Sequence, residues 1–422
     1  TFEPLIKVAE LPPHIAENFK YSGPDKRSGD WVSKRLLCDG TTPVYSTSSE
    51  VLGVLGNHGF ESAKLLVRMA QLDKDNGTYY RNIEYNKDGS VKKVKGMLQY
   101  VQPDNIIHHN LNLTATTTGR LSSSNPNLQN LPRDGTSKVK QMFTSRFGDD
   151  GVIIEIDYMH CYRLAFKLKE DYNEVLRKAV QDASDPDHKR YKQMRTDIKP
   201  PSFAAQYGAS AKGIAFATGC TVEYAQEFLD NEAALFPASI AFRGVIRTEV
   251  ERTGNLPEGL HRELNEVTGQ WTLYRRGYWT SPGSTRYSFR QYMAWNAEKR
   301  KHVMDYKDTQ IANYWCQGEA FYLMAVSAGR VIRWLLANEF FRTEEYPEGR
   351  AFLINNVHDA LYFDCHKDVA RQVALAGKAI MEDAPKYMSD QLGYNIGHVP
   401  FPAAAEMGPS MYDKSHVAEE HP

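Results

Sequence analysis

The sequence predicts an α+β fold in which short antiparallel strands accompany long helices. The stretch GVIIEIDY at 151–158 is rich in β-branched residues, as a buried strand is. AFLINNVHDALYFD at 351–364 indicates two short strands around a tight turn at His358–Asp359. Broad apolar helical faces occupy 159–250 and 305–340. A length of 422 residues suits two or three structural units.

Composition argues against several classes of protein. No apolar run reaches 18 residues, and the first residues lack a basic region followed by an apolar core. We therefore expect no membrane span, no membrane partner and no signal peptide. The five cysteines form no CxxC pair, which argues against a zinc site or a disulfide scaffold. Reduced thiols in the cytoplasm are the expectation.

The net charge of −1 gives no indication of nucleic-acid binding, because many such proteins are strongly basic. Any such contact must come from local basic clusters, and each cluster alone is more commonly a solvated run of charge. The clusters are Lys92, Lys93 and Lys95; Lys138 and Lys140; Arg275 and Arg276; and Lys299, Arg300 and Lys301.

The N-terminal part predicts two helices followed by strands. STSSEVLGVL from Ser46 and ESAKLLVRMAQL, which stops near Asn76–Gly77, have helical spacing and suit an antiparallel pair. Residues 78–113 are typical of strands and turns. The polar stretch at 114–133 predicts a surface loop, and its amides and hydroxyls also suit hydrogen bonding to nucleic-acid backbone or minor groove.

One ladder of side chains stands out. Arg195, Lys199, Phe203 and Tyr207 follow one another at steps of four, with Gly208 next. On a helix these four form one slowly winding stripe of two cations and two rings. Cations neutralise the phosphates of a nucleoside triphosphate, and rings pack on sugar and base. An amphipathic helix with a chance ladder explains the spacing equally well.

Two carboxylates also stand at strand ends, Asp157 and Asp359. Phosphoryl transfer by two metal ions needs oxygen ligands of this kind, and magnesium prefers them. The main-chain carbonyl of Tyr158 is a natural further ligand. Taken alone, an aspartate at a strand end is most often a turn former. Likewise His358 alone suits a packed core residue, Arg120 a surface cation, and Gln129 and Asn130 turn residues.

Four segments together resemble the motifs of family A DNA polymerases. TATTTGRLSSSNPNLQNLPR resembles the template-primer motif, IIEIDY the start of motif A, Arg195 to Gly208 motif B, and VHD at 357–359 motif C. They occur in the family's order, and the resemblance extends from about Ser46 to Met407–Gly408. It implies a right-hand fold with an antiparallel-sheet palm, helical fingers and a helical thumb. The implied division is 1–110 thumb, 111–158 and 304–422 palm, and 159–303 fingers.

The resemblance implies a role for each matching residue. Asp157 and Asp359 would hold two Mg²⁺ ions with the Tyr158 carbonyl, and Lys199 would be a further catalytic residue. The implied nucleotide-binding residues are Arg195, Lys199, Phe203, Tyr207, His160 and Tyr158. The implied primer-template residues are Arg120, Gln129, Asn130, Thr117, Gly208, Asn313, Gln317 and His358. The partners would be primer-template DNA and dNTPs; we expect a monomer, and no processivity factor can be named.

The sequence departs from the family pattern in three places. After Asp-Tyr the family continues Ser-Gln-x-Glu and then roughly 25 residues to an Asp-x-His. Here Tyr158 runs into Met159–His160, so a segment containing the steric-gate glutamate is expected to be missing at this point. The acid that follows the family's VHD is Ala360 here. Pro200 and Pro201 interrupt motif B, which predicts a regular helix starting near Pro200 rather than running through all four rungs.

The most consistent function is DNA synthesis on a template, in phage replication within the host cytoplasm. Two alternatives stay open at this point. One is a polymerase relic that binds primer-template without extending it, which the break after Tyr158 favours. The other is a relative of single-subunit RNA polymerases, since the sugar-selecting glutamate is not found.

Overall fold

The computed structural model describes residues 49–418 except 58, 133–135, 160, 183, 219, 267–268 and 297–299. The chain divides into two compact units, whose described parts are 49–77 with 199–237, and 78–198 with 238–418. The predicted bounds of thumb, palm and fingers are a finer division and stay a prediction.

The first unit is helical. Helices α2 (Ser49–Asn57) and α3 (Glu61–Lys74) contact each other and confirm the predicted helix pair. Glu61 in the first turn of α3 and Lys74 in the last both complement the helix dipole. The first three residues of the stretch predicted to be helical from Ser46 lie outside the described residues. Ala205, at the end of the next helix of this unit, packs with α7 (Ala211–Thr218) and α8 (Val222–Leu235) in a small apolar cluster.

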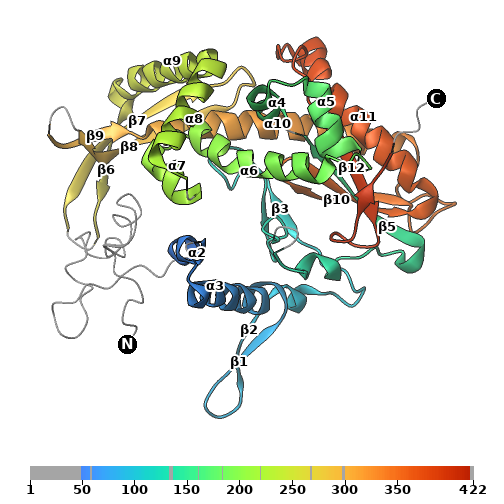
Figure 1. Cartoon of the computed structure of the whole chain (residues 1–422). Coiled ribbons are helices and arrows are strands. Elements are labelled where there is room, and N and C mark those ends of the chain that lie inside the picture. Colours follow the sequence, from blue (N-terminus) through green and yellow to red (C-terminus); the bar gives the residue numbers. More distant parts are fainter. Residues whose placement is uncertain are drawn as a thin grey trace. The chain divides into compact units, whose positions relative to one another are not determined.

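The centre of the second unit is an antiparallel sheet of five strands, in the order β10-β11-β5-β12-β13. The strands are β5 (Gly151–Tyr158), β10 (Ala351–Val357), β11 (Ala360–His366), β12 (Ala403–Gly408) and β13 (Ser415–His416). Helices α10 (Asp308–Ala337) and α11 (Lys367–Leu392) contribute buried side chains to the core on one face (Figure 1). The strands predicted at 151–158 and 351–364 are thus confirmed.

Both faces of β5 are buried along most of its length. Ile154, Ile156 and Tyr158 belong to the main core with α10 and α11. Ile153 belongs to a second cluster on the other face, with Ala360 of β11. Burial on both faces explains the nearly continuous apolar run of this strand. Alternation along the strand places Asp157 on the face of Ile153, away from the main core.

Met159 and Cys161, on either side of the undescribed His160, both have described contacts. The Met159 N–H donates to the Pro402 carbonyl at 2.8 Å, and Cys161 is the N-cap residue of α4 (Tyr162–Leu168). Then come α5 (Tyr172–Leu176), a π-helical turn η6 (Arg177–Gln181) and α6 (His188–Gln206). Cys161 is buried in one apolar cluster with residues of α4, α5 and α6. The segment that the sequence comparison expects after Tyr158 stays a prediction.

Helix α6 corrects the prediction for motif B. It is one α-helix from His188 to Gln206, with Pro200 and Pro201 inside it, rather than a helix that starts near Pro200. Two internal prolines remove two backbone hydrogen bonds and cost several kcal/mol, about 3 each. Buried side chains on both sides of the prolines, Ile198 before and Ala205 after, offset that cost. Tertiary packing has overridden local propensity.

A second sheet was not predicted. The middle of the chain was expected to be helical, and α9 (Pro237–Gly254) completes the predicted helical stretch. It is followed by an antiparallel sheet in the order β6-β7-β8-β9. These strands are β6 (Leu260–Leu264), β7 (Trp271–Thr280), β8 (Arg286–Asn296) and β9 (Lys301–Tyr306). Gly277 allows α9 to approach, since a Cβ there would lie 2.0 Å from the Val250 carbonyl oxygen.

Helix α10 differs from the sequence expectation in one respect. Within the described residues it is the helix long and apolar enough to cross a membrane by length and composition alone. A core helix passes the same test, and Leu323, Met324 and Val331 of α10 pack in the core of the five-stranded sheet. Its helical nature at 305–340 is as predicted.

Short strands precede the five-stranded sheet in the chain. They form two hairpins, β1 (Asn82–Tyr85) with β2 (Val91–Lys95) and β3 (Asn110–Asn112) with β4 (Ser122–Ser124). The buried Ser123 hydroxyl organises the polar loop: it donates to the Pro126 carbonyl and accepts from the Leu128 N–H, both at 3.0 Å. His109 Nδ1 lies 2.7 Å from that hydroxyl and His109 Nε2 lies 3.3 Å from the Ile354 carbonyl of β10.

These contacts predict a pH dependence of stability. Burial lowers the pKa of His109 below its ordinary value of 6.5. The unfolded chain therefore takes up this proton first as the pH falls, so this contribution to stability is complete above about pH 6.5 and is lost as the pH drops toward the folded pKa. Unfolding by denaturant should be measured at pH 7.5 and at pH 5. Between these two pH values His109→Gln should lose less stability than the wild type. His108→Gln is the control, because His108 is exposed; an equal change in both variants would contradict the assignment.

Candidate active site

Asp157 and Asp359 meet at one end of the five-stranded sheet. Asp157 is opposite Ala360 in the antiparallel register of β5 and β11, so Asp359 is one position away. The Tyr158 N–H donates to the Asp359 carbonyl at 3.3 Å. His358 and Asp359 form the two-residue turn from β10 to β11, and His358 has a φ of 56°. A positive φ is costly for histidine, and such strain gathers at functional sites.

The donor set at this end of the sheet suits a hard divalent cation. Asp157 lies on β5 and Asp359 lies in the adjoining β10–β11 turn, and the Tyr158 carbonyl faces the same neighbour as its N–H, toward Asp359. Ala360 contributes an apolar, buried position where the family has an acid. Among the described side chains no group of three or more His, Cys, Asp or Glu gathers to hold a metal. Two aspartates and a carbonyl therefore make up the candidate metal centre.

The surroundings hold Tyr158 and the sheet firmly in place. The Tyr158 hydroxyl donates to the Met381 carbonyl at 2.7 Å and lies 3.0 Å from the Ser327 hydroxyl, and burial raises its pKa. On the opposite face, Lys414 pairs with Glu155, two residues before Asp157. The Lys414 side chain is only 2% exposed. The strand that carries Asp157 is thus fixed from both sides.

Arg195 stands close to the end of β5. Its Nη2 lies 3.6 Å from the sulfur of Met159, two residues after Asp157. It also acts electrostatically on Tyr172 of α5, where it opposes the rise of the tyrosine pKa caused by burial. The structure thus brings one predicted phosphate-binding residue to the same end of the sheet as Asp157.

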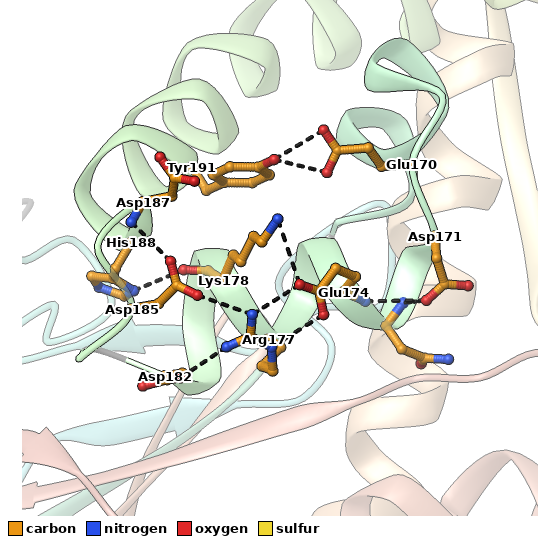
Figure 2. A network of polar contacts seen from close by, with 11 residues as sticks. Glu170, Asp171, Glu174, Arg177, Lys178, Asp182, Asp185, Asp187, His188 and Tyr191 are labelled. Atoms are coloured by element: carbon orange, nitrogen blue, oxygen red, sulfur yellow. Dashed lines mark hydrogen bonds and ion pairs between the residues drawn. The ribbon is translucent and has the colours of Figure 1, made fainter.

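A polar network anchors the first turns of α6, the helix that carries Arg195 (Figure 2). The Arg177 guanidinium donates to carboxylates of Glu174, Asp182 and Asp185 at 2.8–3.1 Å. The pKa of Glu174 is held at about 2, chiefly by its hydrogen bond from Arg177. The Tyr191 hydroxyl of α6 donates to Glu170 at 2.7 Å. That bond and the contact of His188 Nδ1 with the Lys178 carbonyl, at 2.9 Å, join α6 to the segments before it.

The second half of α6 carries the remaining rungs. The Phe203 and Tyr207 rings are stacked, with centroids 6.4 Å apart and an angle of 14° between their planes. Phe203 is 47% exposed and so can receive a ligand. Gly208, with a φ of 77°, ends the helix in a left-handed conformation that suits glycine. Lys199 lies one turn before Phe203 on the same stripe.

The Thr-Gly-Arg turn lies against α10. A Cβ on Gly318 would be 2.8 Å from the Thr118 carbonyl, so the turn and the helix approach as closely as a glycine allows. Asn313 and Gln317 are one turn apart on α10, and Arg120 is close enough to Cys316 to act on its thiol electrostatically. Thr117, the residue before Thr118, is exposed. The structure therefore brings Thr117, Arg120, Asn313 and Gln317 to one region.

Gln129 connects the polar loop to motif C. Its Nε2 donates to the Asn356 carbonyl at 2.7 Å, two residues before His358. The Asn130 side chain is exposed, and its carbonyl accepts from the Tyr79 hydroxyl at 2.8 Å. His160 lies outside the described residues.

Two arginines near Cys316 were not among the predicted site residues. Arg163 of α4 and Arg243 of α9 act electrostatically on the Cys316 thiol together with Arg120. They come from separate helices, so no local spacing could have joined them. Burial nevertheless raises the pKa of Cys316, and the four described cysteines are free thiols.

Comparison with known proteins identifies the family. Residues 33–413 match the model of DNA polymerase family A. The chain therefore belongs to family A of the DNA polymerases. The polymerase domain of Pol1 from M. smegmatis, solved in complex with a DNA primer-template and dNTP, is similar over 89% of this chain and 59% of that one, with 21% identity and a TM-score of 0.53. That likeness confirms the predicted α+β right-hand polymerase fold.

Two relatives of known sequence match this chain over only part of their own length. The chain is 28% identical to the DNA polymerase of Bacillus phage SP01, over 76% of this chain and 34% of that protein. It is 30% identical to DNA polymerase I of Geobacillus stearothermophilus, over 54% of this chain and 26% of that one. The chain thus spans about a third or less of the length of these relatives.

The close approach at Gly318 gives a matched pair of predictions within α10. A Cβ at residue 318 would be 1.9 Å from the Tyr287 hydroxyl as well as touching the Thr118 carbonyl, so Gly318→Ala should lower the free energy of unfolding by about 1–3 kcal/mol. Gly329→Ala is the control, because its Cβ would have only the Arg333 Nη1 within reach, at 3.8 Å. That variant should gain up to about 1 kcal/mol of stability. Denaturant unfolding of both measures the difference; equal effects would contradict the packing described.

Proposed function

We propose that this protein is a template-directed DNA polymerase that adds dNTPs to a primer 3′-OH. The observation that carries the proposal is the meeting of Asp157 and Asp359 at the end of β5 and the β10–β11 turn, in a member of family A. The M. smegmatis structure with primer-template and dNTP supports the same substrates. The reaction forms a bond from the 3′ oxygen to the α-phosphorus and breaks the bond to pyrophosphate.

Asp157, Asp359 and the Tyr158 carbonyl are the residues that would hold two Mg²⁺ ions. Such ions, when bound, lower the pKa of the primer hydroxyl and neutralise charge on the leaving phosphates. The protein's own contribution is rigidity. Tyr158 is anchored through its hydroxyl, and the β5–β11 register keeps Asp157 beside the turn that carries Asp359.

The stripe on α6 would bind the incoming nucleotide. Arg195 and Lys199 would neutralise its phosphates, with His160 as a further phosphate contact, and Phe203 would pack against the sugar and base. Tyr207 would stack near the templating base. Helix α6, from His188 to Gln206, supports this arrangement, because it carries Arg195, Lys199 and Phe203 at steps of four and Tyr207 follows its last residue.

The polar loop, α10 and the motif C turn would line the minor groove of the primer-template. That groove presents acceptors in every Watson–Crick pair, so amides and arginines can test pair geometry without reading sequence. The carriers are Arg120, Gln129, Asn130, Thr117, Gly208, Asn313, Gln317 and His358. The proximity of Arg120 to Cys316, and the Gln129 bond to Asn356, support a shared role.

We further propose a role in phage DNA replication within the host cytoplasm, as a monomer. The similarity to a Bacillus phage enzyme supports the first point, and the free thiols suit a reducing compartment.

Primer extension with magnesium and dNTPs tests the function. Asp157→Asn and Asp359→Asn should each reduce the single-turnover rate more than about a hundredfold, because each removes a charged metal ligand. Asp150→Asn is the control, since Asp150 is an exposed acid just before β5. A wild-type protein that binds primer-template but extends nothing would instead indicate a relic. Preference for rNTPs over dNTPs would indicate an RNA polymerase relative.

Lys199 generates a separate prediction. We expect it to donate a proton to the leaving pyrophosphate as well as to bind phosphate. Lys199→Arg keeps the cation but holds its proton too tightly, so it should retain nucleotide affinity and lose single-turnover rate. Lys199→Ala should lose both. Rapid-quench measurement over a dNTP series separates affinity from rate, and near-normal rates in Lys199→Ala would refute the role.

A further inference from the structure

The β6–β9 sheet has two faces of different character. On one face Trp279, Tyr287 and Phe289 pack with Ile246 and Val250 of α9 and with Ile311 of α10. The Thr253 hydroxyl of α9 donates to the Tyr278 carbonyl at 2.9 Å, and Arg275 Nη1 donates to the Gly254 carbonyl at 2.9 Å. This face is part of the protein core. Alternation places the side chains between these positions on the opposite face.

The opposite face, which we call the tyrosine–arginine face, alternates rings and cations. It comprises Tyr274, Arg276 and Tyr278 of β7, Arg286, Ser288, Arg290 and Tyr292 of β8, and the adjoining Lys307. The Arg290 guanidinium lies 4.0 Å from the Tyr274 ring centroid, and Arg286 lies 4.0 Å from that of Tyr278. Lys307 Nζ lies 4.1 Å from the Tyr292 centroid. Each tyrosine thus carries a cation on its ring.

The charge of this region contrasts with that of the chain. Residues 260–307 contain nine Lys and Arg against four Asp and Glu, a net of +5 in a chain of net −1. The acids near the face are already neutralised: Glu263 pairs with Arg290, and Asp305 pairs with Arg247 of α9. Among the described residues Arg276 and Arg286 form no ion pair, and the hydroxyl of Ser288 accepts from Arg276 at 3.4 Å. Two positive charges are therefore available to a ligand.

Arg276, Tyr278 and Arg286 are neighbours on this face. Arg276 and Tyr278 are two residues apart on β7, and Arg286 is opposite Thr280, the next residue on that face. Arg286 is exposed and Tyr278 is partly exposed. Guanidinium edges donate to phosphate oxygens, while ring and guanidinium planes stack on bases. A row of this kind fits a chain of alternating phosphates and unpaired bases.

We propose that the tyrosine–arginine face binds an unpaired nucleic-acid strand. A duplex would engage the arginines but offers no free base plane to Tyr278, and an acidic protein segment would engage only the charges. The inference rests on the proposed function, because DNA synthesis is what would supply that strand. It is either the template that has not yet been copied or the strand displaced ahead of synthesis.

Binding of a labelled single-stranded oligodeoxythymidylate, followed by fluorescence anisotropy over a salt series, tests the proposal. Arg276→Gln/Arg286→Gln should weaken binding at least tenfold and reduce the slope of log affinity against log salt by about 1.4, or about 0.7 for each phosphate that is no longer neutralised. Tyr278→Leu should weaken binding about tenfold with an unchanged slope, because the stacking of one base is removed. Tyr278→Phe keeps the ring and should bind like wild type.

Arg333→Gln/Arg342→Gln is the matched control, because it removes two exposed arginines from a different part of the chain. It should bind within about twofold of wild type. Equal losses of affinity in both double variants would overturn the proposal. Full affinity in Tyr278→Leu would also overturn it, and would indicate a purely electrostatic surface for duplex or acidic protein. Thermal unfolding of every variant verifies that the sheet is intact.

Two DNA substrates distinguish the source of the strand. If the variants of this face lose affinity for a primer-template with a 5′ template overhang but not for a blunt one, the bound strand is the uncopied template. If the variants lose affinity only for a fork with a displaced strand, the bound strand is the displaced one. Neither readout requires catalysis, so a protein that failed to extend primers yet showed these losses would contradict the proposed function and support the single-strand site.

Discussion

The antiparallel pairing of β5 with β11 is the constraint on which the candidate active site depends. Ile154 and Ile156 face Leu361 and Phe363 within one buried core. A slip of one residue would turn these side chains out of the core and drive Asp157 into it. The hydrophobic effect therefore fixes a polar geometry: the register that buries the isoleucines also sets Asp157 beside the turn that carries Asp359.

The same logic extends to α6. Its first turns are held by polar contacts, from Tyr191 to Glu170 and from His188 to the Lys178 carbonyl, and its interior residues Ile198 and Ala205 are buried. The helix crosses Pro200 and Pro201 between these anchors. Two missing backbone hydrogen bonds are a local cost, whereas the anchors act on the whole helix. The stripe that is proposed to bind the nucleotide would need such a helix, because each side chain must keep its direction.

Elements that follow from local residue patterns could be predicted from the sequence, whereas features that depend on tertiary packing could not. The β-branched run at 151–158 and the strands around His358 follow from residue type and alternation. The continuity of α6 does not, since it depends on packing against the helices before and after it. Arg163 and Arg243 near Cys316 could not be foreseen, because their helices are distant in sequence. The second sheet was foreseeable: WTLYRRGYWT and RYSFRQYMAW flank Ser-Pro-Gly-Ser, an aromatic-rich hairpin pattern within the stretch that the family resemblance assigned to helical fingers.

That second sheet contacts both α9 and α10. Tyr287 of β8 donates to Glu319 of α10 at 3.1 Å, and its ring fills the space that Gly318 leaves open. The predicted minor-groove residue Gln317 directly precedes Gly318 on α10, and Asn313 lies one turn before Gln317. The two neighbours of Tyr287, Arg286 and Ser288, point to the tyrosine–arginine face. One strand therefore joins the site that would inspect paired DNA to the face that would hold an unpaired strand, and the rigidity of β8 sets the geometry between them.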